Sequence, residues 1–230
     1  MSDGPPVSRE TPVRPVQADA VAGPRAGLLQ EYAAELADVG VARGLIGPRE
    51  AARLWERHLL NCAVVAPAAP HGATVCDVGS GAGLPGVVWA IVRPDLQVTL
   101  LEPLLRRTVF LHEVVESLAL TNVEIVRGRA EEHGPSTYDV VTSRAVAPLD
   151  RLVRWCLPLV AVGGRMVAMK GESASRELAD ARDLIRRFGG GEPVLNTYGE
   201  GVLEQITRAV LIVRESAHGP PQGARTEGTA

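Results

Sequence analysis

A glycine-rich run between residues 76 and 86, CDVGSGAGLPG, carries the clearest chemical signal in this chain. Glycine has no Cβ, so such a run lets the backbone turn sharply and approach a bound ligand closely. The helix that we expect after it would present free N–H groups in its first turn. The candidate ligand-binding residues of the run are Asp77, Gly79, Gly81, Gly83 and Leu84. The alternative is a plain turn between a strand and a helix.

An acidic residue favours the ligand-binding interpretation. Glu102 ends the next apolar run, 23 residues after Gly79, at a separation typical of a carboxylate that accepts hydrogen bonds from ribose hydroxyls. A dinucleotide fingerprint would need a glycine at the position of Leu84. The pattern G-x-G-x-G, with Asp77 two residues ahead of it, is similar to the S-adenosylmethionine loop of class I methyltransferases. S-adenosylmethionine contains no pyrophosphate, so the missing glycine is not required.

The basic residues are divided unevenly between arginine and lysine. Lys170 is the only lysine among 24 basic residues, and it ends a predicted strand, as Arg144 does. We interpret the retained lysine as a need for a compact, rotatable ammonium group, with a chance remainder as the alternative. The formal net charge of −3 argues against nucleic-acid binding over the whole surface, so any such contact needs a local basic patch.

Neither covalent cysteine chemistry nor a metal site is predicted. Cys76 falls in an apolar strand and Cys156 in a predicted helix, so both are interpreted as packing residues. His58 and Cys62 form an i, i+4 pair, but no further metal ligand is evident beside them. The cysteine usage and the lack of a secretory signal or a membrane-spanning apolar run predict a cytoplasmic protein.

From residue 73 onward the apolar pattern predicts strands that alternate with helices. The predicted strands are 73–78, 97–102, 123–127, 138–144, 165–170, 192–197 and 207–214, and the predicted helices are 85–92, 104–119, 148–160 and 172–188. Apolar runs such as VTLL and DVVT favour a parallel sheet covered on both faces. No helix separates the last two strands, which predicts an antiparallel hairpin at one edge. The expected fold is α/β, a Rossmann-like class I methyltransferase with a seven-stranded, mostly parallel sheet.

The chain is predicted to form one domain, 25–215, between disordered tails at 1–24 and 216–230. Two N-terminal helices, 25–39 and 48–65, form a helical extension over 25–70, and the Rossmann-like core occupies 71–215.

The second N-terminal helix carries a candidate RNA-binding stripe. Arg49, Arg53 and Arg57 recur at i, i+4 and i+8, which would align three cations along an RNA backbone. A solvated helix face, in which these arginines pair with Glu50 and Glu56, fits the spacing equally well.

Several motifs in fixed order resemble the bacterial ribosomal small-subunit methyltransferase G family, also called glucose-inhibited division protein B. They are DVGSGAGLPG (77–86), LLEPLLRRTVFL (100–111), RAEE (129–132), TSRAVAPL (142–149), MKG (169–171) and GPREAARLWERHLLN (47–61). The resemblance covers residues 28–215. It implies S-adenosylmethionine as cofactor and N7 of one guanine in the decoding-region loop of 16S rRNA as the target. The implied partner is the small ribosomal subunit, with no DNA and no membrane, and a monomer is our default expectation.

The resemblance also implies residue roles. Gly79 and Leu84 would line the cofactor site, Glu102 would bind the ribose, and Ala130 and Glu131 would lie against the adenine. Arg144 would stand at the boundary of cofactor and RNA, and the Arg57-His58 pair looks like that of the family's N-terminal helix. We take Arg57 and His58 as candidate RNA-binding residues, with packing or a hydrogen bond near the cofactor as the alternative for His58.

Guanine N7 carries a lone pair and no proton, so the reaction needs alignment and desolvation rather than a general base. The common arginine grip on guanine occupies O6 and N7 together. We therefore expect Arg144 and Lys170 to hold O6 or a flanking phosphate and to leave N7 free. For Arg144 the alternative is an ion pair with an acid such as Glu131.

Three other functions remain as alternatives. They are a methyltransferase for a small molecule or a protein, a non-catalytic cofactor-binding module and a nicotinamide oxidoreductase.

Overall fold

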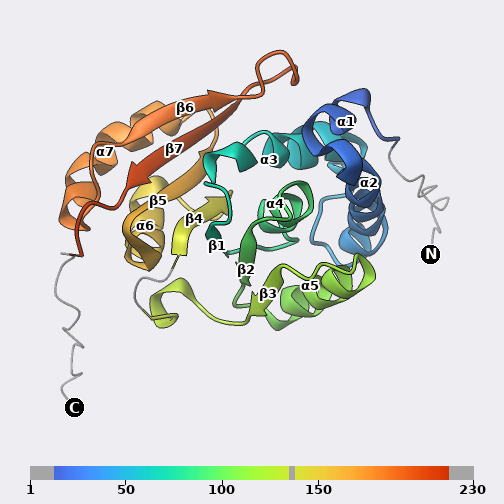
Figure 1. Ribbon diagram of the computed structural model, residues 1–230, viewed down its shortest axis with the longest axis horizontal. Helices are drawn as coiled ribbons and strands as arrows, with labels where there is room; N and C mark the ends of the chain where they lie inside the picture. Colours follow the sequence, from blue (N-terminus) through green and yellow to red (C-terminus); the bar gives the residue numbers. More distant parts are fainter. Residues whose placement is uncertain (1–12, 135–137, 218–230) are drawn as a thin grey trace, which may run out of the picture.

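A seven-stranded sheet forms the centre of the computed structural model, which describes residues 13–134 and 138–217 (Figure 1). The strands are β1 (Thr74–Val78), β2 (Gln97–Leu101), β3 (Val123–Val126), β4 (Tyr138–Arg144), β5 (Val160–Lys170), β6 (Val194–Tyr198) and β7 (Thr207–Val213). Their order is β3-β2-β1-β4-β5-β7-β6, with β7 antiparallel to both of its neighbours and the other pairs parallel. The predicted α/β fold with an antiparallel edge hairpin is confirmed.

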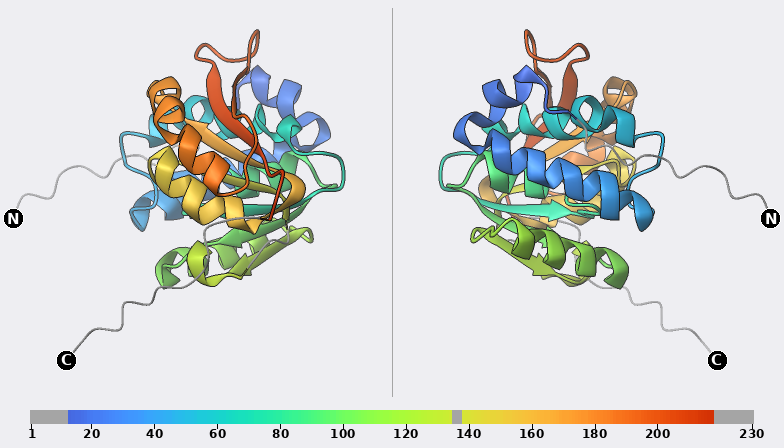
Figure 2. Two further views of the ribbon diagram at one scale, coloured as in Figure 1. Left: turned by 90° about the vertical axis from the view of Figure 1, so that its left-hand side faces the viewer. Right: turned by 90° about the vertical axis from the view of Figure 1, so that its right-hand side faces the viewer.

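Helices cover both faces of the sheet. They are α1 (Val16–Ala22), α2 (Ala26–Glu35), α3 (Asn61–Ala63), α4 (Gly86–Val92), α5 (Leu105–Ser117), α6 (Leu149–Cys156) and α7 (Ala174–Arg187). Side chains alternate between the two faces of the sheet along each strand. Val75 therefore belongs to the apolar core on one face, which includes residues of α1 to α5, whereas Cys76 belongs to the apolar core on the other face, which includes residues of α6 and α7. Figure 2 shows α6 and α7 toward the viewer in one view, and α1, α2 and α5 in the opposite view. Among the described residues, no helix is long and apolar enough to cross a membrane.

The N-terminal tail is shorter than predicted. Residues 16–24 were expected to be disordered because of the nearby prolines, but α1 and a 3₁₀ turn, Gly23–Arg25, begin there, and Ala18 and Ala22 are buried. These two alanines are one helical turn apart, so their small side chains let α1 pack closely on the protein. Residues 1–12 and 218–230 of the expected tails lie outside the described part. Ser216 belongs to the folded part, since its N–H donates to the carbonyl of Gly189.

The second N-terminal helix is not one regular helix over 48–65 as predicted. It begins as a 3₁₀ turn at Ala51–Arg53, continues as a π-helical segment at Trp55–Leu60, and ends as α3. The change of helix type alters the direction of its side chains, and Arg49 lies in a turn ahead of it. The spacing i, i+4, i+8 therefore does not place Arg49, Arg53 and Arg57 on one regular helical face.

Candidate active site at the carboxyl edge of the sheet

The glycine loop between β1 and α4 has the backbone that the sequence predicts. Gly79, Gly81 and Gly83 have φ angles of 69°, 62° and 95°, which favour glycine over any residue with a side chain. A Cβ on Gly83 would lie 2.5 Å from Cγ2 of Val87. Leu84 is buried within the loop. The loop forms a tight cradle at the end of β1.

Asp77 holds this loop from inside. Its Oδ2 accepts hydrogen bonds from Ser80 Oγ at 2.7 Å and from the N–H of Gly86 at 2.8 Å. Its Oδ1 is buried and has no hydrogen-bond partner among the described residues. Burial raises the pKa of Asp77 to about 6. Asp77 therefore orders the loop and keeps one oxygen for a polar group at the site.

Glu102 connects the end of β2 to the same loop. Its carboxylate accepts the N–H of Gly81 at 2.9 Å and the N–H of Leu104 at 3.0 Å, and Nη1 of Arg107 lies 3.6 Å away. Each carboxylate oxygen has a further lone pair. The carboxylate predicted to bind the ribose is thus fixed beside the glycine loop and is almost fully buried there.

Ala130 and Glu131 lie in a 3₁₀ turn, Ala130–Glu132, that follows β3 at the same edge of the sheet. Ala130 is buried and Glu131 is exposed. The turn thus places an apolar contact and an acid on the β3 side of Glu102, where the adenine was expected.

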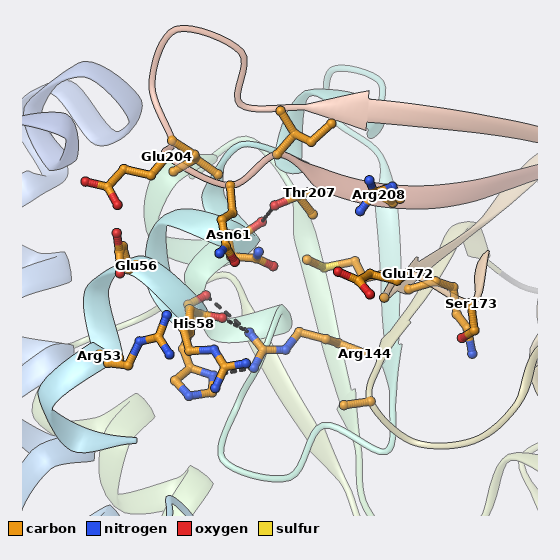
Figure 3. A pocket seen from close by; sticks show the side chains of 18 of the residues that line it. Arg53, Glu56, His58, Asn61, Arg144, Glu172, Ser173, Glu204, Thr207 and Arg208 are labelled. Carbon is orange, nitrogen blue, oxygen red and sulfur yellow. Dashed lines mark hydrogen bonds between the residues drawn. The ribbon is translucent and has the colours of Figure 1, made fainter. Parts of the chain in front are cut away.

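Arg144 ends β4 and contacts the N-terminal extension rather than Glu131. Its Nη1 lies 3.3 Å from each of three acceptors, the carbonyl oxygens of Arg57 and His58 and the Sγ of Cys62. Its Nη2 contacts Nδ1 of His58 (Figure 3). The alternative of an ion pair with Glu131 is wrong, because the extension supplies all the acceptors observed for Arg144.

His58 has both ring nitrogens engaged within the protein. Nδ1 faces Arg144, and Nε2 lies 3.1 Å from Oε2 of Glu50. Burial, aided by the nearby charge of Arg144, lowers the pKa of His58 to about 4. The ring is therefore neutral near pH 7. Within the described residues, no group of three or more candidate ligands could hold a metal ion.

Lys170, the single lysine, is paired rather than free. Its Nζ lies 2.6 Å from Oε2 of Glu177 and donates to the carbonyl of Ala147 at 3.0 Å. Glu177 also accepts from Ser173 Oγ and from the N–H of Leu149. Burial alone would raise the pKa of Glu177, but these hydrogen bonds, with that of Lys170 the strongest, lower it. The network joins the ends of β4 and β5 to the first turns of α6 and α7.

Arg144 and Lys170 line the same cleft, which has a volume of about 980 Å³ and lies between the N-terminal extension and the β6–β7 hairpin. Its basic lining residues are Arg53, Arg57, Arg144, Lys170 and Arg208, its acidic ones are Glu50, Glu56, Glu172, Glu177 and Glu204, and the neutral ring of His58 also lines it. The formal charges of this wall balance, so the expected basic patch is absent here. Arg57 pairs with Glu50 at 3.1 Å, and Arg49 does not line the cleft.

Sequence reasoning missed several of these residues. Glu177, Thr207 and Arg208 line the cleft, although they lie 119 to 150 positions after His58 in the sequence. Figure 3 shows Thr207 and Arg208 across the cleft from His58. Only the sheet order brings these segments together. The sequence predicted that Lys170 ends a strand and that Glu177 lies in the helix after it, but it did not show that the first turn of this helix faces the end of the strand.

Comparison with known proteins identifies the family. The family model described as rRNA small subunit methyltransferase G matches residues 25–197, which is more than half of the chain. This chain belongs to the rRNA small subunit methyltransferase G family. The relative of that name from Salinispora arenicola is 57% identical over 210 residues, which cover 88% of this chain and 87% of the relative. The one from Thermobifida fusca is 58% identical over 189 residues, covering 82% and 80%.

Solved structures support the fold of this methyltransferase G family member. A predicted O-methyltransferase from Agrobacterium tumefaciens superimposes with a TM-score of 0.54 at 15% identity, covering 69% of this chain and 82% of that one. TYW2 from Pyrococcus horikoshii gives a TM-score of 0.53 at 14% identity, covering 66% and 61%. At such identities the likeness shows a shared class I methyltransferase fold.

Proposed function

We propose that this protein transfers a methyl group from S-adenosylmethionine to N7 of one guanine in the decoding-region loop of 16S rRNA. The observation that carries the proposal is the position of Arg144 and Lys170. Arg144 ends β4, the strand beside β1 and its glycine loop, and Lys170 ends β5, the next strand in the sheet. Both residues line a cleft of about 980 Å³, large enough for a nucleotide. Membership of the rRNA small subunit methyltransferase G family supports the class of substrate.

The residues at the glycine loop fit the cofactor. The left-handed backbone of Gly79 and Gly81 keeps side chains out of the cradle, and the buried Oδ1 of Asp77 is an acceptor that lacks a partner among the described residues. Glu102 would hold the ribose hydroxyls, while Leu84 and Ala130 supply apolar contact. When bound, S-adenosylmethionine supplies an electrophilic methyl group on a sulfonium centre.

The chain needs no nucleophile or base of its own for this reaction. Guanine N7 offers an unprotonated lone pair, so no proton has to be removed before it attacks. Cys62, Cys76 and Cys156 are buried, and burial raises the pKa of each thiol. These thiols therefore do not form a covalent intermediate, and the protein contributes alignment and exclusion of water.

Lys170 can hold guanine O6 or a phosphate without leaving its partners. An ammonium group has three donors, of which Glu177 and the carbonyl of Ala147 take two. The third donor is left for the substrate, and a single donor leaves N7 free. Arg144 supplies its fixed guanidinium from the neighbouring strand end.

The partner in this proposal is the small ribosomal subunit or its precursor in the cytoplasm, bound by a monomer. We would incubate the purified protein and labelled S-adenosylmethionine with small subunits from a strain that lacks this gene. Label in 16S rRNA, lowered more than tenfold by Lys170→Ala and by Lys170→Arg, is the expected result. Undiminished transfer by Lys170→Arg would contradict the role of the single donor. The absence of label with wild-type protein that binds the cofactor would overturn the proposed function.

A further inference from the structure

One short helical stretch of the N-terminal extension anchors the guanidinium of Arg144. All four observed acceptors come from Arg57, His58 and Cys62, which belong to the π-helical segment and α3. π-Helical turns are rare and are frequently found at functional sites. Here the segment turns two consecutive carbonyl oxygens and one imidazole toward the end of β4. The orientation of Arg144 is therefore set by the extension and not by its own strand alone.

The chemistry of the donor decides the protonation of His58. A guanidinium group can only donate hydrogen bonds, so Nδ1 of His58 must be the acceptor and carries no proton. The proton of the neutral ring then sits on Nε2, which donates to Oε2 of Glu50 at 3.1 Å. The carboxylate of Glu50 thus selects the tautomer that presents a lone pair to Arg144.

Both nitrogens of His58 are consumed by this chain of contacts, and neither is left for rRNA. The ring is mostly buried, with 13% of its side chain exposed. The charged groups that face it are Glu50, Arg57 and Arg144. A second proton on the ring would place an N–H donor against the guanidinium and break the contact.

We propose that His58 is a positioning residue, with Glu50 fixing its tautomer, and that it aims Arg144 into the cleft for methyl transfer. This inference rests on the proposed function and replaces the expected direct contact of His58 with RNA. It predicts that replacing His58 lowers the kcat of methyl transfer and leaves the affinity for the small subunit nearly unchanged.

Two substitutions separate the two nitrogens of the ring. His58→Asn puts an amide oxygen near the place of Nδ1, so Arg144 keeps its acceptor. His58→Gln puts its amide near the place of Nε2, so Nη2 of Arg144 loses the acceptor that Nδ1 provides. We expect His58→Asn to keep at least a third of the wild-type kcat and His58→Gln to lose at least tenfold. The KM for small subunits and for cofactor should change less than threefold in both.

Glu50 is tested in the same assay. Glu50→Gln keeps an oxygen that can accept from Nε2, and it should retain most of the kcat, whereas Glu50→Ala should lower it at least threefold. His112→Gln and Glu116→Ala, on the exposed side of α5, are the matched controls. Thermal unfolding of each variant shows whether it remains folded.

The outcomes distinguish this inference from the proposed function. Equal kcat values for His58→Asn and His58→Gln, or changes confined to the KM for subunits, would overturn the positioning role while wild-type protein still methylates 16S rRNA. A wild-type protein that methylates no rRNA would overturn the proposed function itself. Nitrogen-15 NMR of the histidine ring gives an independent readout, since a proton on Nδ1 at pH 7 would contradict the inference whatever the activity.

Discussion

At the scale of single residues, two carboxylates, Asp77 and Glu102, hold the glycine loop that we propose binds the cofactor. Glu102 accepts two backbone N–H groups from different loops, and its own charge strengthens both bonds. Glu102→Ala leaves these amides without their acceptor and removes the ribose contact that we propose. We expect the Kd for S-adenosylmethionine to rise about 10- to 100-fold, since hydrogen bonds to a charged group contribute about 1.5–3 kcal/mol each. Calorimetric titration would measure the Kd, with Glu124→Ala, at an exposed position of β3, as the control. An unchanged Kd for Glu102→Ala would contradict the role of Glu102 in binding the cofactor.

Asp77 predicts a pH dependence of stability. Its pKa is raised to about 6 in the folded protein, above the ordinary carboxyl value. Its contribution to stability is therefore fully present below about pH 4 and is lost as the pH rises through 6. Asp77→Asn cannot ionise, so its free energy of unfolding relative to wild type should rise between pH 4.5 and 7, by about 2 kcal/mol.

Asp77 is tested by the difference in the free energy of unfolding between Asp77→Asn and wild type. The wild-type value alone is not sufficient, because the titration of His58 changes stability in the opposite direction over the same pH range. The pKa of His58 is lowered to about 4, so its contribution is present above its ordinary value and is lost as the pH falls. Urea unfolding at several pH values would measure both proteins. A difference that stays constant from pH 4.5 to 7 would show that Asp77 ionises normally.

At the scale of elements, the N-terminal extension holds the glycine loop as well as Arg144. The buried hydroxyl of Tyr32, on α2, donates to the carbonyl of Ala82 at 2.6 Å. The indole N–H of Trp89, on α4, donates to the carbonyl of Cys62 at 3.0 Å. The extension therefore contacts the glycine loop, the helix after it and the end of β4, and it acts as part of the site rather than as an appendage.

Tyr32→Phe tests this connection with the loss of one oxygen atom. The buried carbonyl of Ala82 would lose its partner, so we expect a loss of about 1–3 kcal/mol in the free energy of unfolding. The Kd for S-adenosylmethionine should rise several-fold because the loop is less well ordered. Tyr198→Phe on β6 is the control. If Tyr32→Phe had the stability and the Kd of the wild type, the hydrogen bond from α2 would not contribute to the order of the glycine loop.

The elements also show where sequence reasoning succeeds and where it stops. The apolar runs and glycines predict every strand and the loop between β1 and α4, because these signals are local. The helix predicted over 148–160 ends at Cys156, since Pro158 cannot continue it, and β5 starts earlier than predicted, at Val160. The contacts of Arg144 and Lys170 were beyond prediction because their partners depend on packing between distant segments.

At the scale of the whole molecule, a net charge of −3 and a charge-balanced cleft predict a modest dependence of rRNA binding on salt. Each phosphate contact contributes about 0.7 to the slope of log K against log salt for a single strand. Arg53→Ala with Arg208→Ala should lower that slope by about 1.4, while Arg187→Ala, at the far end of α7, should not. Filter binding to small subunits would measure it, and an unchanged slope would remove both arginines from the interface.

The chemical identity of the methylated atom tests the central claim most directly. Small subunits from a strain lacking this gene would be treated with the protein and S-adenosylmethionine, and their 16S rRNA would then be reduced with borohydride and cleaved with aniline. Aniline cleaves at reduced 7-methylguanosine. We predict one new cleavage site in the decoding-region loop, absent with Arg144→Ala. Methyl incorporation without cleavage, or cleavage outside that loop, would contradict the proposed reaction or its target.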